Sequence, residues 1–376
     1  MRLVPSRAIR RGLVAAVVAI TVLAAATIGL AWYSAVRLTD VVHVGPSYPL
    51  RVLSVGRAQR YVVLSRGPDA LEPGTFRLAW KGGQAVVGAV AATTASTVTR
   101  ELSAVVGHLS PGQAAGVQAD RYTGDPWQAL RIRFRSVRVP TPLGPMPAWY
   151  VPGALHTWVI VVHGLGGSRA DGLSAISLLH PLGFPTLAIT YRNDVGAPAS
   201  RDHLSHLGTT EWRDVGRAVD YAMSSGASGV VLYGYSLGGA MCLVTAHDPA
   251  YSRHVEAIVL DSPLLGWRST LAFQASRVHL PAFMAALVAT MASWRTGADL
   301  SMLSEPVLER DLSVPALLFQ GTADTVVPPY LAARFARADR RLVTYVAVKG
   351  ADHVGAVGAD PSLYRAALDR FLARFR

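Results

Sequence analysis

A serine flanked by glycines is the first feature of this sequence that indicates chemistry. Ser236 is the centre of a Gly-Tyr-Ser-Leu-Gly motif, residues 234–238, which follows a β-branched run and precedes a helix of small residues. A tight turn from strand to helix exposes the serine hydroxyl, and glycines on both sides relieve the crowding in such a turn. A bare Gly-x-Ser-x-Gly pattern, with any residue at x, arises by chance in roughly one such sequence in five. The motif indicates a nucleophilic serine mainly because it lies between a predicted strand and a predicted helix.

A serine hydroxyl needs a base to remove its proton, and a carboxylate must orient that base. His353, after the last predicted strand, is the expected base, and Asp324, directly after the preceding strand, is the expected acid. Two other acids are alternatives. Asp261 also ends a predicted strand, and Asp352 adjoins the histidine, although neighbouring side chains point in divergent directions. The sequence therefore predicts Ser236, Asp324 and His353 as a catalytic triad.

The tetrahedral intermediate of acyl transfer also needs N–H donors for its oxyanion. Residues 163–167 have the sequence His-Gly-Leu-Gly-Gly and follow a predicted buried strand, so their flexible backbone can aim an amide at the site. We expect the amides of Leu165 and Leu237 to be the two donors. His163 is expected to be a structural part of this turn rather than a base.

The remaining reactive residues imply no cofactor and no metal. Cys242 is the single cysteine, so an intrachain disulfide and a metal site of several thiolates are excluded, and we expect this thiol to be buried. The His, Asp and Glu residues show no convincing metal-ligand spacing. His203 and His206 lie in a polar loop and are expected to be solvated, with contact to the substrate as the alternative.

Short apolar runs that alternate with helical patterns make up the second part of the chain. Such runs are suited to strands buried on both faces. Their alternation with helices predicts an α/β fold, a mostly parallel sheet with helices on both faces. The predicted strands cover residues 132–140, 148–151, 158–162, 188–191, 229–233, 257–260, 316–319 and 345–348, and the clearest predicted helices cover residues 210–223 and 329–338.

Extra chain lies before the predicted strand at 316–319. Residues 264–312 include a largely apolar helical stretch from Phe273 to Met291. Two interpretations are open, ordinary core packing or a helical cap over the cleft. An apolar cap would favour acyl or other hydrophobic substrates and exclude water during the reaction.

Together these features resemble the α/β-hydrolase superfamily. The resemblance covers residues 131–376, about two thirds of the chain. Within the superfamily this part is similar to the serine aminopeptidase-like and prolyl-oligopeptidase-like branches, which include lysophospholipase and monoacylglycerol lipase relatives. The resemblance implies an α/β-hydrolase fold with a cap insertion and leaves the substrate open. The matching segments are residues 163–166, 191–194, 234–238, 260–263, 321–324 and 352–353.

The N-terminus carries a hydrophobic segment. Residues 12–36 are uncharged, and at ~1.5 Å per residue a helix of this length spans a hydrocarbon core of ~30 Å. Residues 1–11 include four arginines, whereas Arg37 alone follows closely, so the positive-inside rule places residues 1–11 in the cytoplasm and the rest outside. A cleaved secretory signal is the alternative, although its apolar core usually has only ~7–15 residues. We therefore expect a single-pass protein of the cell membrane or, alternatively, a secreted one.

Residues 37–130 are the hardest part of the chain to interpret. Strand-like patterns at 61–64 and 76–80, with a hairpin turn at 81–84, indicate a small accessory segment that contains β-structure. We assign it no chemistry. The expected role is that of a spacer or cap between membrane and enzyme.

The overall composition excludes two classes of protein. Hydrophobic residues make up 51% and charged residues 16%, which favours a packed core over disorder. The net charge of +12 is almost wholly due to arginines, which are scattered apart from an N-terminal cluster. Because they form no basic stripe with interleaved aromatic residues, no nucleic-acid partner is expected.

The sequence thus predicts a membrane-anchored serine hydrolase that cleaves carboxylic esters through an acyl-enzyme on Ser236. A small-molecule or lipid-like ester is the expected substrate, and ester cleavage is favoured over peptide cleavage. An acyltransferase and a peptidase that use the same triad are alternatives. A non-catalytic, membrane-anchored binding protein is an alternative of another class, which the intact triad disfavours.

Overall fold

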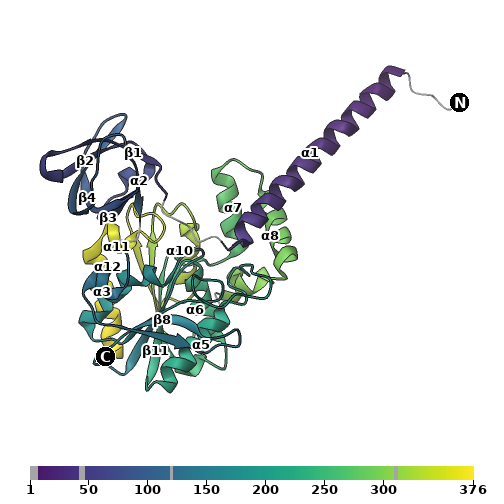
Figure 1. Ribbon diagram of the computed structural model, residues 1–376. Helices are drawn as coiled ribbons and strands as arrows, with labels where there is room; N and C mark the ends of the chain where they lie inside the picture. Colours follow the sequence, from purple (N-terminus) through teal and green to yellow (C-terminus); the bar gives the residue numbers. More distant parts are fainter. Residues whose placement is uncertain (1–6, 42–46, 119–121, 309–311) are drawn as a thin grey trace.

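The computed structural model describes residues 7–41, 47–118, 122–308 and 312–376. A long helix, a small closed barrel and an α/β body follow one another along the chain (Figure 1). The barrel lies over one part of the body, and the helix projects away from another part beside the green helices of residues 267–296. The two N-terminal parts therefore meet the body at different places.

The long helix is α1, Arg7–Thr39. Most of its side chains between Gly12 and Leu30 are exposed, whereas Ala31 and Ala35 are fully buried against the body. Among the described residues it is the one helix long and apolar enough to cross a membrane, with a mean hydropathy of 2.6. A signal sequence near an N-terminus meets the same criteria.

Six antiparallel strands close into the barrel, in the order β1-β2-β5-β4-β3-β6. The predicted hairpin turn is present, because Trp80 pairs with Gly83 across it. A short helix, α2 (Pro68–Leu71), lies between the second and third strands. The strands are β1 (Leu50–Val55), β2 (Tyr61–Ser65), β3 (Phe76–Trp80), β4 (Gly83–Thr93), β5 (Thr97–Val106) and β6 (Ala114–Gln118).

The α/β body is built on an eight-stranded sheet in the order β14-β13-β12-β11-β9-β10-β8-β7. The strands from β9 to β14 are parallel, and β8 and β7 add an antiparallel edge. This arrangement confirms the predicted fold class. The strands are β7 (Arg135–Val139), β8 (Met146–Val151), β9 (Thr157–Val162), β10 (Thr186–Ile189), β11 (Gly229–Tyr235), β12 (Val255–Asp261), β13 (Ala316–Gly321) and β14 (Val343–Val348).

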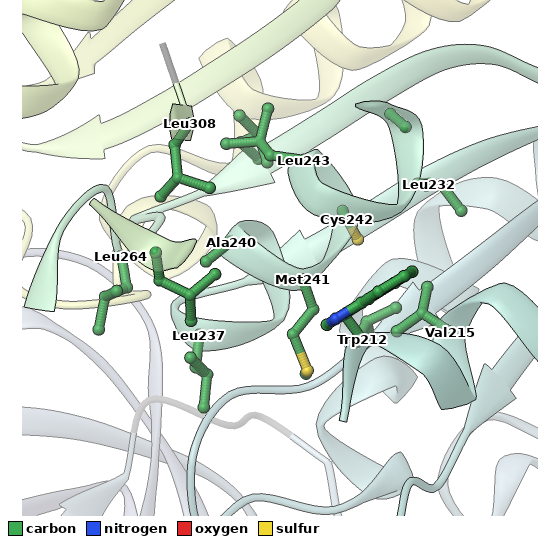
Figure 2. Packing of buried hydrophobic residues seen from close by; sticks show 14 of the residues in the cluster. Trp212, Val215, Leu232, Leu237, Ala240, Met241, Cys242, Leu243, Leu264 and Leu308 are labelled. Atoms are coloured by element: carbon green, nitrogen blue, oxygen red, sulfur yellow. The ribbon is translucent and has the colours of Figure 1, made fainter. Parts of the chain in front are cut away.

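Helices cover both faces of the sheet, and each face has its own apolar cluster. Figure 2 shows Leu237, Met241 and Leu243 of α6 packed in one of these clusters. Cys242 of the same helix is fully buried, as predicted. The helices of the body outside residues 264–312 are α3 (Pro126–Leu130), α4 (Leu173–Leu179), α5 (Trp212–Ser224), α6 (Leu237–His247), α10 (Pro329–Ala338), α11 (Ala356–Ala359) and α12 (Pro361–Leu372).

The chain between β12 and β13 forms three helices, α7 (Trp267–Arg277), α8 (Ala282–Thr296) and α9 (Glu305–Leu308), and buried residues of α8 such as Val288 and Ala292 belong to one apolar cluster of the body. The single apolar helical stretch predicted from Phe273 to Met291 is therefore wrong in detail. His279 has a φ of +58°, and Pro281 precedes α8, so the backbone turns between two helices. The end of α1 packs on α8, where Trp32 and Trp294 have ring centroids 5.8 Å apart.

Candidate active site

Ser236 sits in a strained turn between β11 and α6. Its φ of +51° and ψ of −119° are values that a residue with a side chain rarely adopts. The neighbouring glycines are required by space: a Cβ on Gly234 would lie 2.6 Å from backbone atoms of residue 238, and one on Gly238 would lie 2.3 Å from the Val162 carbonyl oxygen. The motif therefore folds as a strand-to-helix elbow because only glycine fits at both positions.

The structure brings the predicted base and acid to this serine. The Nε2 atom of His353 lies 2.9 Å from the Ser236 hydroxyl oxygen. The Nδ1 atom of the same ring lies 3.0 Å from Oδ2 of Asp324. Both distances are within hydrogen-bonding range, so the ring bridges hydroxyl and carboxylate.

The Asp324 carboxylate is held by several donors. Its Oδ1 accepts hydrogen bonds from the amides of Val326 and Val327, each at 2.9 Å, and its Oδ2 accepts one from the Gln320 side chain at 2.8 Å. Burial alone would raise the pKa of this carboxyl. The hydrogen bond and the charge of His353, together with the two amides, outweigh that effect and hold the pKa below its usual value. Asp324 is therefore ionised and fixed in orientation.

The two alternative acids have other partners. Asp261 is fully buried below the site and accepts a hydrogen bond from the Tyr364 hydroxyl at 2.8 Å. Burial raises the pKa of Asp261 to about 6. Asp352 accepts hydrogen bonds from the backbone amides of Thr325 and His353, each at 2.7 Å. Asp352 thus joins the loop that carries Asp324 to the loop that carries the histidine.

The predicted oxyanion donors lie beside the serine. Leu237 is the first residue of α6, so its N–H has no acceptor within the helix. Leu165 lies in the turn after β9, and its neighbour Gly164 approaches Ser236 so closely that a Cβ there would lie 3.1 Å from the serine Cβ. The Tyr191 hydroxyl donates to the Gly164 carbonyl oxygen at 2.7 Å and holds the turn in place.

The sequence did not indicate the ion pair that supports this turn. Nε2 of His163 lies 2.8 Å from Asp194 Oδ2, and Nδ1 lies 2.9 Å from the Gly164 carbonyl oxygen. Burial alone would lower the pKa of His163, but the charge and hydrogen bond of Asp194 outweigh it and raise the pKa. A ring with acceptors at both nitrogens is stabilised in its doubly protonated form. The Tyr191 ring stacks on this imidazole at 4.3 Å between centroids.

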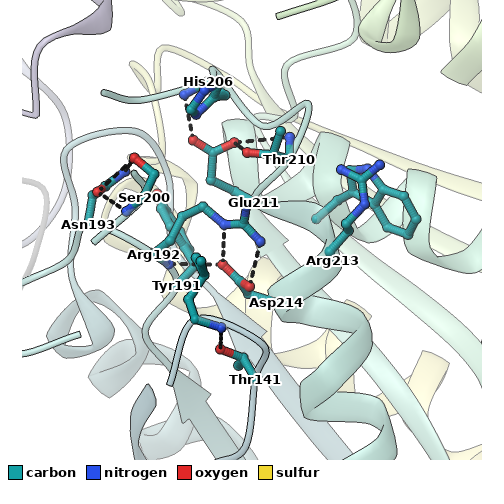
Figure 3. A network of polar contacts seen from close by, with 12 residues as sticks. Thr141, Tyr191, Arg192, Asn193, Ser200, His206, Thr210, Glu211, Arg213 and Asp214 are labelled. Atoms are coloured by element: carbon teal, nitrogen blue, oxygen red, sulfur yellow. Dashed lines mark hydrogen bonds and ion pairs between the residues drawn. The ribbon is translucent and has the colours of Figure 1, made fainter. Parts of the chain in front are cut away.

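A polar network holds the chain between β10 and α5 next to the oxyanion turn (Figure 3). Arg192 makes two hydrogen bonds of 2.8 Å to the carboxylate of Asp214. Glu211 accepts from the amides of His206 and Gly208 at 2.8 and 3.0 Å. The expected solvation of His206 is wrong, because its side chain is 14% exposed and pairs with Asp202.

His203 is exposed, as expected. Neither His203 nor His206 lines the pocket that contains Ser236. Within residues 7–41, 47–118, 122–308 and 312–376, no group of three or more His, Cys, Asp and Glu side chains is placed to hold a metal ion.

Comparison with known proteins shows what the second part of the chain is similar to. The sequence profile of the prolyl oligopeptidase family matches residues 191–375. An esterase of Pyrococcus furiosus superposes with a TM-score of 0.55 at 19% identity, over 67% of this chain and 94% of the esterase. DcsB, solved in complex with its substrate analogue, superposes with a TM-score of 0.51 at 16% identity, over 64% of this chain and 99% of DcsB.

The protein has the α/β-hydrolase fold. Its residues 191–375 are similar to the serine hydrolase branch of that superfamily. Identities this low show the fold and leave the substrate open. The barrel matches the profile of a domain of unknown function, DUF8805, over residues 51–118. No protein with a curated description matches the sequence.

The barrel of this α/β-hydrolase contacts the loop that carries the histidine. The Asp352 N–H donates to Oε1 of Glu72 at 3.3 Å, and the Thr75 N–H donates to the Gly358 carbonyl oxygen at 2.9 Å. Gly74 has a φ of +115°, and a Cβ there would lie 2.0 Å from the same carbonyl oxygen. Glycine is therefore required where the barrel touches the hydrolase body.

The pocket at Ser236 has a volume of about 330 Å³, and the barrel contributes to its wall. Gln118, the last residue of β6, lines it opposite residues of the hydrolase body. The accessory segment therefore reaches the site, a contact that no local sequence pattern indicated. The other lining residues are Gly164, Leu165, Gly167, Asp171, Ser174, Tyr235, Ser236, His353, Val354 and Val357.

Proposed function

We propose that this α/β-hydrolase cleaves carboxylic esters through an acyl-enzyme on Ser236, with His353 as base and Asp324 as the acid that orients it. One observation carries the proposal: a single imidazole lies 2.9 Å from the Ser236 hydroxyl and 3.0 Å from the Asp324 carboxylate. Catalysis is the role that explains why a serine with a strained backbone faces a histidine that is itself bound to a buried carboxylate.

The proposed reaction has two steps. As His353 Nε2 takes the hydroxyl proton, Ser236 Oγ attacks the carbonyl carbon, and the bond to the alkoxy oxygen then breaks with transfer of that proton to the leaving alcohol. In the second step water attacks the acyl-enzyme and gives a proton to the same nitrogen. The ester bond to Ser236 breaks, the proton returns to the serine, and the carboxylic acid is released.

The developing oxyanion needs donors that are already in place. We assign this role to the amides of Leu165 and Leu237. The His163–Asp194 pair supports the first of these amides, because it fixes the Gly164 carbonyl and hence the turn. The His163 ring also lies next to the turn, and its protonated form, which Asp194 stabilises, favours negative charge on the substrate oxygen.

We further propose that α1 anchors the enzyme in the cell membrane with the hydrolase body outside the cytoplasm. The exposed apolar surface of α1 and the N-terminal arginines support the proposal. The intact mass of the protein extracted from membranes tests it. A mass that lacks the N-terminal segment would show instead that α1 is a cleaved signal.

Labelling of the full chain with a fluorophosphonate, followed by an ester panel of increasing acyl length, tests the catalytic assignment. Ser236→Ala should abolish labelling and lower kcat by about 10⁴-fold or more. Ser225→Ala, at an exposed serine after α5, is the matched control and should behave as the wild type. Labelling that survives Ser236→Ala refutes the assignment.

Peptide cleavage is a second candidate, which the match of residues 191–375 to the prolyl oligopeptidase family favours. The same serine would attack an amide carbonyl, and His353 would protonate an amine instead of an alcohol. A panel of aminoacyl and prolyl amides, run beside the esters, separates the two activities. Product analysis with added alcohols or amines separates hydrolysis from acyl transfer.

A further inference from the structure

Three hollows adjoin one another on the surface of the molecule. The pocket at Ser236 and a pocket of about 170 Å³ share Leu165 and Gly167 in their walls. That second pocket and a groove of about 440 Å³ share Arg37 and Leu38, at the end of α1. Shared walls make the hollows neighbours, and we call this row of hollows, from Ser236 to the end of α1, the path.

Charged side chains line the middle one of the three hollows. Its wall is mostly apolar by area, but it includes Arg37, Asp40 and the segment from Tyr191 to Asp194. The groove is largely apolar, with walls from α1, α7 and α8. Its apolar lining residues include Leu271, Val278, Leu280, Met284 and Val288. A ligand that extends across the three hollows therefore meets charged side chains next to its scissile bond and an apolar groove beyond them.

The groove lies at the level where α1 would leave a membrane. The exposed apolar stretch from Gly12 to Leu30 is about 28 Å long at ~1.5 Å per residue, close to the thickness of a hydrocarbon core. Trp32 and Tyr33 follow it, and such rings favour the membrane interface. Tyr33 also lines the groove. The base of α1 lies beside α7 and α8 in Figure 1.

The helices of the groove are tied to the catalytic loops. The side chain of Gln274, on α7, donates to the carbonyl oxygens of Thr325 and Val326 at 3.1 and 2.7 Å. These residues directly follow Asp324. On the other side, Arg295 of α8 pairs with Asp40 at 2.7 Å. The groove therefore has a fixed position relative to both the site and α1.

We propose that this path binds a diacyl lipid of the membrane leaflet in which α1 ends. The scissile ester lies at Ser236, the polar backbone of the lipid lies in the middle pocket, and the retained acyl chain lies in the groove between α1, α7 and α8. The inference rests on the proposed ester hydrolysis and on the proposed membrane anchor. It names the substrate class as an ester whose alcohol part carries a second apolar chain.

The test uses the full chain in phosphatidylcholine vesicles that contain dioleoylglycerol, with p-nitrophenyl butyrate as the water-soluble ester. Val278→Glu and Leu280→Glu place a charge in the groove wall. Each should lower the ratio of dioleoylglycerol to butyrate hydrolysis at least about tenfold, because the retained chain loses an apolar contact. Ala286→Glu, at an exposed position of α8 outside the groove, is the matched control and should leave the ratio unchanged.

Crosslinking measures binding without turnover. Ser236→Ala in the same vesicles, with a diacylglycerol that carries a photoreactive group at the end of one chain, should crosslink within α7, α8 or the end of α1. Crosslinks confined to other parts of the body overturn the inference, as does an unchanged hydrolysis ratio in both groove variants or an equal loss in Ala286→Glu. Wild-type cleavage of butyrate but not of dioleoylglycerol overturns it and leaves the proposed function intact. Cleavage of neither ester refutes both.

Discussion

Glu72 and Asp352 are 280 positions apart in the chain, and a hydrogen bond of 3.3 Å joins them. The donor is the backbone N–H of Asp352, one residue before His353, and the acceptor is a carboxylate of the barrel. Asp352 in turn binds the amide of Thr325, one residue after Asp324. The barrel is therefore connected to both loops that carry the proposed base and acid.

Glu72 should make the stability of the protein depend on pH. Burial raises the pKa of its carboxyl from 4.5 to about 7. The folded protein keeps this proton over a range in which the unfolded chain has lost it, so the free energy of unfolding falls as the pH rises from about 4.5 to about 7. Glu72→Gln keeps an acceptor for Asp352 and removes the titration. At pH 8 it should be the more stable protein, by on the order of 2 kcal/mol.

Thermal unfolding of Glu72→Gln and the wild type at pH 5 and pH 8 measures this difference. Glu101→Gln, at an exposed position of the barrel, is the matched control and should keep the pH dependence of the wild type. An unaltered pH dependence in Glu72→Gln would contradict the prediction.

Asp324→Asn and Asp261→Asn should separate the two candidate acids. Asparagine at 324 leaves His353 without its charged partner, so kcat should fall by about 10³–10⁴-fold with KM little changed. Asparagine at 261 keeps an acceptor for the Tyr364 hydroxyl, and kcat should fall by less than about tenfold. Equal losses in both variants would argue that the proposed acid is wrong.

Gly238→Ala should damage the fold rather than the chemistry alone. The added Cβ would lie 2.3 Å from the Val162 carbonyl oxygen, in the backbone of the neighbouring strand, which cannot move without disrupting the sheet. We expect a loss of more than about 3 kcal/mol of stability, measured by thermal unfolding. Gly88→Ala is the control, because its Cβ would meet its nearest neighbour at an ordinary 3.4 Å. If the Gly238→Ala protein is as stable as the control, the turn at Ser236 has room for a Cβ at residue 238 and the prediction is wrong.

Gln118→Ala should change substrate binding from the barrel side of the pocket. Because Gln118 lines the pocket without touching the proposed triad, KM should rise about three- to tenfold while kcat stays nearly constant. Ester kinetics at a fixed pH measures both constants. Ser103→Ala, at an exposed position of β5, should leave KM unaltered. A fall in kcat at constant KM would show instead that Gln118 acts on the transition state rather than on substrate binding.

Local patterns were sufficient to predict the fold class. The strands of the body, such as Thr157–Val162, are continuous apolar runs, and the helices between them have the period of a buried face. The glycines around Ser236 likewise follow from a local requirement, the space available in one turn. Such features depend on residues close together in the chain, and for that reason a single sequence reveals them.

The choice between acids needed the tertiary structure. Asp261 and the residues before Asp324 end two neighbouring strands, and both positions lie at the carboxyl edge of the sheet. Asp261 is the last residue of its strand and lies buried beneath the site, whereas Asp324 lies three residues beyond Gly321 and reaches the histidine. The order of residues in the sequence does not show how far each carboxylate lies above the sheet edge, because that distance depends on strand register and on the path of the loop.

The sequence by itself determined that a serine on an elbow, a later aspartate and a later histidine belong to an α/β sheet behind an apolar N-terminal helix. Only the tertiary structure decided that Glu72 and Gln118 of the barrel reach this site, and that Asp194 pairs with His163 below the oxyanion turn. These residues are distant in sequence from their partners and carry no periodic signal. Their contacts arise from how closed barrel, sheet and loops pack together, and packing is a property of the whole chain.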